Sequence, residues 1–128
     1  MQIYGISTKF ICEVIMMKIA IVGSRGLYIH DFKKYLPDDT TEIISGGAKG
    51  IDTCAKRCAL KYGIRFIEIL PDYAKYGKSA PLKRNDKIIE MADTVLAIWD
   101  GRSAGTKYVI NKCRKMNRSI TIINIEKQ

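Results

Sequence analysis

The fold is decided by one stretch of the chain, Thr41-Glu-Ile-Ile-Ser-Gly-Gly-Ala-Lys-Gly-Ile-Asp-Thr-Cys-Ala-Lys-Arg-Cys-Ala-Leu-Lys-Tyr-Gly63. Its start over 41–44 predicts a short strand, and the Ser-Gly-Gly that follows predicts a turn. Apolar residues then recur at the spacing of one helix face, with cations on the other face, and Gly63 ends the helix. These apolar positions are Ile51, Cys54, Ala55, Cys58, Ala59 and Tyr62. A strand, a glycine-rich loop and a helix in this order form one unit of an α/β fold.

Further strand and helix signals extend in both directions from this unit. Strands are predicted over 19–22, 64–70, 94–99 and 119–125. Helices are predicted over 28–36, over 81–91 and around Val109, Ile110, Cys113 and Met116, with a polar loop over 72–79. Because single helices join successive strands, the sheet is expected to be parallel with right-handed crossovers. We predict an α/β fold of the Rossmann-like type: a doubly wound, mostly parallel five-stranded sheet with helices on both faces.

Length and composition limit what the chain can be. Its 128 residues suffice for one domain, which we place at 17–128. Residues 1–16 are interpreted as an N-terminal extension, forming an edge strand or an arm, or as the result of a mis-assigned start. The formal net charge of +9 favours phosphorylated or polyanionic partners. No segment approaches the roughly 20 apolar residues of a membrane span, so no membrane partner is expected.

The cysteines argue against a metal site and for a reducing compartment. Cys12, Cys54, Cys58 and Cys113 contain no C-x-x-C pair, and His30 is the only histidine. A structural zinc site needs four such ligands, so no metal is expected. We expect the thiols to be buried and reduced, which is typical of a cytoplasmic protein.

Three glycine-rich loops each join a predicted strand to a helix start. They hold Gly23, Ser24 and Arg25 after the first strand, Ser45, Gly46, Gly47 and Lys49 after the second, and Asp100, Gly101, Arg102, Ser103, Gly105 and Thr106 after the fourth. In open parallel sheets, ligands bind at the carboxyl ends of the strands. Helix starts offer backbone N–H groups and partial positive charge to a phosphate, and glycine lets the phosphate approach. One such loop has a purely steric explanation, but three at one sheet edge predict a phosphate-binding site.

The segment after the third strand adds polar candidates. They are Asp72, Tyr76 and Lys78 in the predicted loop, and Arg84 and Asn85 near the start of the next helix. A guanidinium at position 84 can hold a phosphate with two hydrogen bonds, and Tyr76 can stack on a base. Asp72 and Asp100 can hold ribose hydroxyls, although capping a helix would explain each of them equally well. Trp99 either stacks on a base or packs in the core.

Two common nucleotide motifs are absent. A G-x-G-x-x-G fingerprint starting at Gly23 would need glycine at positions 25 and 28, where the chain has Arg25 and Tyr28. A Walker A loop is also missing, because the glycine-rich segment 46–50 has the wrong length and no Lys-Thr follows it. The sequence therefore disfavours a nicotinamide dehydrogenase and a P-loop nucleotidase.

Several of these segments resemble known families. The stretch 45–60 resembles the second strand–helix unit of the DNA-processing protein A (Smf) family, and Ile21-Val-Gly-Ser-Arg25 resembles the end of that family's first strand. The stretch 92–106, with Tyr76-Gly-Lys78 and Arg84-Asn85, is similar to small stand-alone members of the SLOG superfamily, of the YspA-related kind. The resemblance covers residues 18–123. It implies a Rossmann-like fold that binds nucleotides or nucleotide-derived signals.

A comparison with the lonely-guy phosphoribohydrolases of the same superfamily bears on catalysis. The resemblance places Arg84 where those enzymes hold a catalytic arginine, and Gly105-Thr106 matches their Gly-Thr. Three residues after the threonine those enzymes carry a catalytic glutamate, whereas this chain has Val109. The resemblance thus implies phosphate binding and puts hydrolysis in doubt.

Three hypotheses of function follow. The first is binding of a phosphorylated nucleotide-type ligand, with a sensor role, and no other cofactor is expected. The second is an N-glycosidic nucleotide hydrolase that uses the same pocket, with Arg84 as its catalytic residue. The third is a single-stranded DNA-binding module, whose binding we expect to be weak and mainly electrostatic. Whether the protein forms a homodimer is left open.

Overall fold

A computed structural model describes residues 17–46 and 49–126. Its five strands are β1 (Lys18–Gly23), β2 (Glu42–Ser45), β3 (Arg65–Glu68), β4 (Thr94–Trp99) and β5 (Ile120–Asn124). They form one sheet in the order β3-β2-β1-β4-β5, and every neighbouring pair is parallel. The chain winds outward from β1 in one direction to β3, and from β4 in the other direction to β5. The predicted doubly wound, five-stranded parallel sheet is confirmed.

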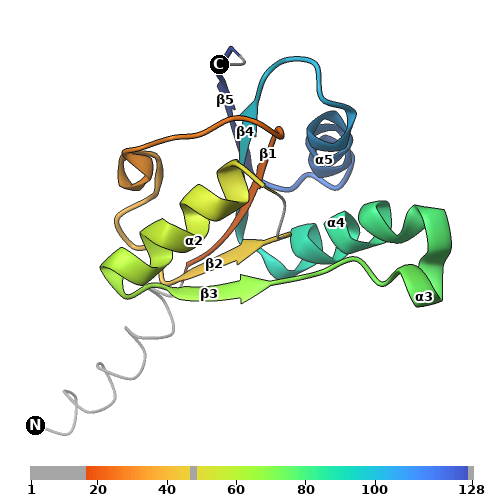
Figure 1. The fold of residues 1–128 in the computed structure, drawn as a ribbon, viewed down its shortest axis with the longest axis horizontal. Coiled ribbons are helices and arrows are strands. Elements are labelled where there is room, and N and C mark those ends of the chain that lie inside the picture. The colour runs from red at the N-terminus through yellow and green to blue at the C-terminus, as the bar shows by residue number, and fades with distance from the viewer. Residues whose placement is uncertain (1–16, 47–48, 127–128) are drawn as a thin grey trace, which may run out of the picture.

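Helices cover both faces of this sheet (Figure 1). The helical elements are η1 (Phe32–Tyr35), α2 (Ile51–Tyr62), α3 (Tyr73–Tyr76), η2 (Gly77–Ser79), α4 (Ala80–Met91) and α5 (Ala104–Lys115), of which η1 and η2 are short 3-10 helices. The sheet packs against α2 and η1 on one face and against α4 and α5 on the other. Gly63 ends α2 in the left-handed conformation, with φ at 66°, as predicted from its position.

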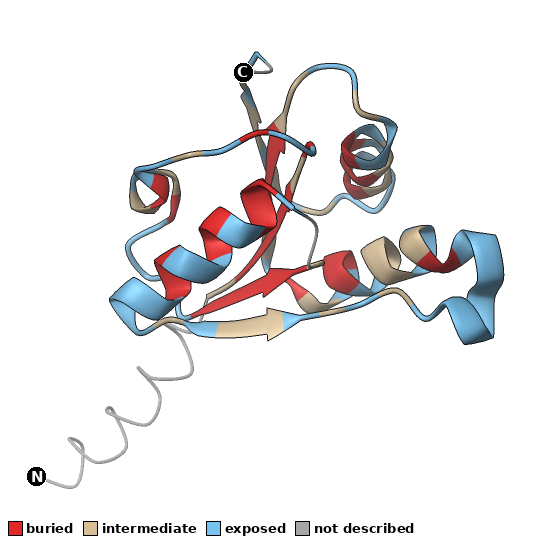
Figure 2. Ribbon diagram, viewed as in Figure 1, coloured by how far each residue is buried: buried red, intermediate tan, exposed pale blue. Residues whose placement is uncertain are grey.

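The core follows from the alternation of side chains along the central strands. On β1, Ile19 and Ile21 point to the α2 face, whereas Ala20 and Val22 point to the face covered by α4 and α5. All four are buried, as expected for a strand that helices cover on both faces. Figure 2 shows the buried residues along β1 and β2 and on the inward side of α2.

Two predicted segments differ from the observed structure. The helix expected over 28–36 is reduced to η1. Residues 28–30 form no helix or strand, and the Ile29 N–H donates to Cys54 Sγ on α2. The polar loop expected over 72–79 is helical, since it forms α3 and η2. The Asp72 carboxylate explains the difference, because it accepts a hydrogen bond from the Lys75 N–H and caps α3.

The start of the described chain is tied to the sheet. The Met17 carbonyl accepts hydrogen bonds from the N–H groups of Thr41 and Glu42, and its own N–H donates to Thr41 Oγ1. The predictions for residues 1–16 and for Gly47 lie outside the described residues. Within the described ranges, no helix has the length and apolar character that crossing a bilayer requires.

Candidate functional site

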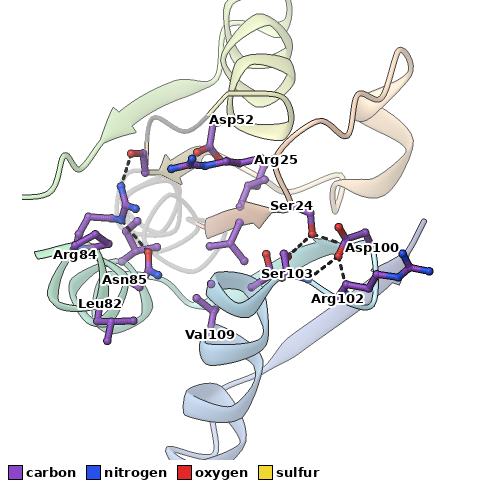
Figure 3. Close-up of a pocket in the computed structure, with 18 residues that line it drawn as sticks. Ser24, Arg25, Asp52, Leu82, Arg84, Asn85, Asp100, Arg102, Ser103 and Val109 are labelled. Atoms are coloured by element: carbon purple, nitrogen blue, oxygen red, sulfur yellow. Dashed lines mark hydrogen bonds between the residues drawn. The ribbon is translucent and has the colours of Figure 1, made fainter. Parts of the chain in front are cut away.

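A cavity of about 610 Å³ opens where the strand order reverses (Figure 3). β1 and β4 are neighbours in the sheet, but the chain leaves them toward opposite faces, so their following loops diverge. The loops after β1, β2 and β4 and the starts of α4 and α5 all contribute to the wall. Eleven of the predicted loop and helix residues line it: Gly23, Ser24, Arg25, Gly46, Arg84, Asn85, Asp100, Arg102, Ser103, Gly105 and Thr106.

Hydrogen bonds join the two diverging loops at the base of the cavity. Ser24, which is fully buried, has its Oγ 2.6 Å from Ser103 Oγ and accepts a hydrogen bond from the Asp100 N–H. The Asp100 carboxylate accepts from the N–H groups of Ser103 and Arg102, both at 2.8 Å. These backbone hydrogen bonds, Ser103 first, lower the pKa of Asp100. The carboxylate therefore shapes the loop after β4.

The start of α5 presents backbone amides to the cavity. Ser103 precedes the helix, but its hydroxyl does not cap it, since it pairs with Ser24. Gly105 and Thr106 in the first turn line the cavity, and a Cβ on Gly105 would meet nothing within 4 Å. A helix start with this open space beside it is suited to an anion.

Arg84 on α4 forms the opposite wall. Its Nη1 donates to the Gly46 carbonyl, and its Nε donates to Asn85 Oδ1 at 2.8 Å. A Cβ on Gly46 would lie only 2.8 Å from Nη1, so glycine at position 46 allows the guanidinium to approach. Burial lowers the pKa of Arg84, Asp52 opposes this effect, and Arg25 adds to it.

The charges around the cavity favour an anionic ligand. The lining residues include three arginines and two aspartates, so positive charges outnumber negative ones. They are Arg25, Arg84 and Arg102, and Asp52 and Asp100. Burial is the largest cause of the lowered pKa of Arg84, and repulsion by the positive charge of Arg25 is the smallest of the causes. Figure 3 shows Arg25 pointing toward Asp52 on one side of the cavity and Arg84 on the other. An anion between the two arginines would relieve the repulsion.

One side of the cavity is apolar. It includes Val22 from β1, Pro81, Leu82 and Ile88 from α4, and Val109 from α5. Sequence reasoning missed Ile21, Val22, Asp52, Pro81, Leu82 and Ile88 as lining residues. For Asp52 a signal exists, because a carboxylate in the first turn of a helix that follows a glycine-rich loop lies at the sheet edge where ligands bind. The apolar residues give no signal beyond their expected place in the core.

Five predicted residues lie elsewhere. Asp72 and Tyr76 line a separate groove along α4, and Lys78 lies in η2. The reason is the position of β3 at the edge of the sheet, two strands away from the switch point, so the segment after it leads to the outer end of α4 (Figure 1). Lys49 is exposed, and Gly101 lies in the loop beside the Asn124 side chain; neither lines the cavity.

Three further residues have structural positions. Ser45 is fully buried at the end of β2, and its hydroxyl has no hydrogen-bond partner among residues 17–46 and 49–126. Gly23 packs under α2, where a Cβ would lie 2.4 Å from the Cβ of Ile51. The Trp99 indole Nε1 donates to the Ser103 carbonyl at 3.0 Å, so the ring supports the start of α5.

A family model matches the part of the chain that supplies the loops after β1 and β2. The family model described as DNA recombination-mediator protein A matches residues 11–81, more than half of the chain. The chain belongs to this family. The DNA recombination-mediator protein A match spans β1 to β3 and ends at Pro81, so it includes Arg25, Gly46 and Asp52 but not α5. No curated protein and no solved structure matches the chain.

Proposed function

We propose that the protein binds the phosphate group of a nucleotide-type ligand in the cavity at the switch point. The observation that carries the proposal is that Arg84, Arg25 and the start of α5 line one cavity, with open space beside Gly105. The guanidinium of Arg84 supplies directed N–H donors, and the helix start supplies backbone donors. Family membership supports a role connected with DNA or nucleotides.

The apolar side of the cavity supports a ligand that carries a base. A phosphate held between Arg84 and Gly105 leaves the rest of the ligand beside Pro81, Leu82 and Val109. Nucleotide sites commonly combine a few placed polar groups with an apolar surface for the ring. The cavity volume of about 610 Å³ lies in the range of small-molecule sites, roughly 300–1,000 Å³.

Replacing Arg84 tests this proposal. Arg84→Ala is expected to weaken binding of a nucleoside monophosphate, measured by calorimetry, by at least about tenfold, or about 1.4 kcal/mol. Arg84→Lys should restore only part of the affinity, because an ammonium lacks the planar fork. Arg114→Ala, an exposed arginine of α5 outside the cavity, is the matched control for loss of charge. Equal affinity for wild type and Arg84→Ala would refute phosphate binding at this site.

We further propose that the site binds its ligand without cleaving it, as a sensor does. Glycosidic cleavage needs a carboxylate to activate water or stabilise the developing charge on the sugar. Val109 lies in the cavity wall where the resemblance to phosphoribohydrolases would place a glutamate. Asp100 is held by backbone amides, and Asp52 lies beside the Arg25 side chain (Figure 3). Incubation with a panel of nucleoside monophosphates is expected to release no free base above the uncatalysed rate. Base release that Arg84→Ala abolishes would instead establish the hydrolase.

A further inference from the structure

A second, smaller cavity lies on the α2 face of the sheet. It has a volume of about 190 Å³ and is formed between η1, with the segment before it, and the side of α2 that faces η1. We call it the α2 groove. Its lining includes the buried residues Cys54 and Cys58, and also Tyr28, Lys33, Arg57, Lys61 and Tyr62.

The α2 groove is rich in positive charge. Lys33 comes from η1, and Arg57 and Lys61 come from α2, whereas Asp31 is the one carboxylate that lines the groove. The local sequence has the same bias, because between Asp52 and Glu68 it contains four cationic residues and no acidic one. The groove thus carries an excess of cations that arrive from two separate elements.

Two of these cations converge on one aromatic ring. The Nζ atoms of Lys33 and Lys61 lie 5.6 Å and 5.3 Å from the centroid of the Tyr62 ring. In the part of the chain that the structure describes, neither ammonium forms an ion pair with a carboxylate. Burial raises the pKa of Cys58, the charges of Lys33 and Lys61 act to lower it, and the charge of Asp31 acts to raise it, so these three charged groups all lie near the Cys58 thiol. Two ammonium groups at one groove give it a positive potential, which favours an anionic ligand.

Aromatic rings flank the same cations. Tyr28 is 50% exposed and Tyr62 is 47% exposed, although both line the groove. An exposed tyrosine face can stack on a base, and stacking beside a positively charged track is how proteins hold nucleotides without reading their sequence. The rings and the cations together therefore match both parts of a nucleotide.

We propose that the α2 groove is a second phosphate-binding site, where Lys33, Arg57 and Lys61 hold the phosphate and a base stacks on Tyr28. The site is argued from its own residues, so it stands or falls independently of the cavity that contains Arg84. Two kinds of ligand carry this phosphate and base: a free nucleoside monophosphate, or one nucleotide of a DNA strand.

The test is a titration of the full chain followed through backbone amide shifts. Adenosine monophosphate and a short oligothymidylate are each added at physiological ionic strength, with inorganic phosphate as a third probe. We expect amides of 28–33 and 57–62 to shift with a saturation curve that Arg84→Ala leaves unchanged. Tighter binding of the oligothymidylate than of the mononucleotide identifies a DNA strand as the source, and the reverse order identifies the free nucleotide.

Charge-matched variants separate a site from general attraction. The double variant Lys33→Gln/Lys61→Gln should weaken binding in the groove by at least about tenfold. The double variant Lys34→Gln/Lys56→Gln removes the same charge from exposed positions of the same two elements that do not line the groove, and it should change binding little. The proposal is overturned if both variants weaken binding equally, if the groove amides do not shift, or if inorganic phosphate binds as tightly as the nucleotides.

Discussion

At the scale of single residues, the surroundings of a glycine show whether the fold or the candidate site requires it. Gly23 has Ile51 against it and is needed for α2 to pack on β1, whereas Gly105 has open space beside it. The same residue type in two loops of one sheet edge therefore has two different explanations. Substituting each with alanine distinguishes them.

Gly23→Ala is expected to destabilise the fold by about 1–3 kcal/mol, because the new Cβ forces the buried Ile51 side chain aside. Gly105→Ala should keep or raise stability by up to about 1 kcal/mol, since alanine is a better helix former and meets no neighbour. It should nevertheless weaken nucleotide binding, because its methyl group occupies the space beside the helix start. Thermal unfolding and calorimetry measure both effects. Undiminished binding by Gly105→Ala would place the phosphate elsewhere.

Asp100 makes the loop after β4 sensitive to acid. Its pKa in the folded protein is lowered by the amides of Ser103 and Arg102, so the folded state favours the charged form. The stabilisation is present above the ordinary aspartate pKa of about 4 and is lost as the pH falls through the lowered value. In Asp100→Asn this dependence disappears, so the stability difference from wild type should shrink on acidification. Denaturant unfolding at a series of pH values checks this, and a constant difference would contradict it.

At the scale of elements, α2 joins the two proposed sites. Its first turn carries Asp52 at the cavity, and the side that faces η1 carries Arg57 and Lys61 at the α2 groove. Its inward side buries Cys54 and Cys58, as the spacing of its apolar residues predicts. One amphipathic helix of 12 residues therefore supplies core packing and charged groups to two cavities.

The buried thiols lead to a prediction about reactivity. Burial raises the pKa of Cys58 and of Cys113 on α5, so both stay protonated near neutral pH. Since the thiolate is the reactive form, iodoacetamide should modify both cysteines slowly in the native protein and rapidly in denaturant. Peptide mass mapping after timed labelling distinguishes each site. Rapid native labelling of Cys58 would show that the α2 groove opens to reagents.

How well the sequence predicts the structure differs from one element to the next. The pattern of apolar residues predicted α2 and β4 with their observed bounds, because each pattern spans the whole element, and the helix predicted over 81–91 differs from α4 by one residue at its start. The helix predicted over 28–36 is wrong for most of its length. Ile29 donates a hydrogen bond to a side chain 25 residues away, and a contact at this separation cannot be read from the local spacing of apolar residues. Tyr76 follows β3, and its place outside the cavity depends on β3 being an edge strand. The sequence predicted that the strand order reverses but not which strands lie on either side of the reversal.

At the scale of the whole molecule, the described core uses residues from Met17 onward. Met17 packs against the α2-face core, and its backbone bonds to Thr41 and Glu42. A chain that begins at Met17 keeps these groups. We therefore predict a melting temperature within about 4 °C of the full chain, which corresponds to roughly 1 kcal/mol for a domain of this size. Calorimetric unfolding of both chains measures the difference, and a larger loss would assign residues 1–16 to the folded domain.

The cavity at the switch point is assembled from two separate lengths of chain. Residues before Pro81 supply Arg25, Gly46 and Asp52, and residues from Pro81 onward supply the apolar wall of α4 and α5. The family match ends at the junction between them. Substitutions at Leu82 or Val109 would therefore change the apolar wall and leave the loops after β1 and β2 unchanged.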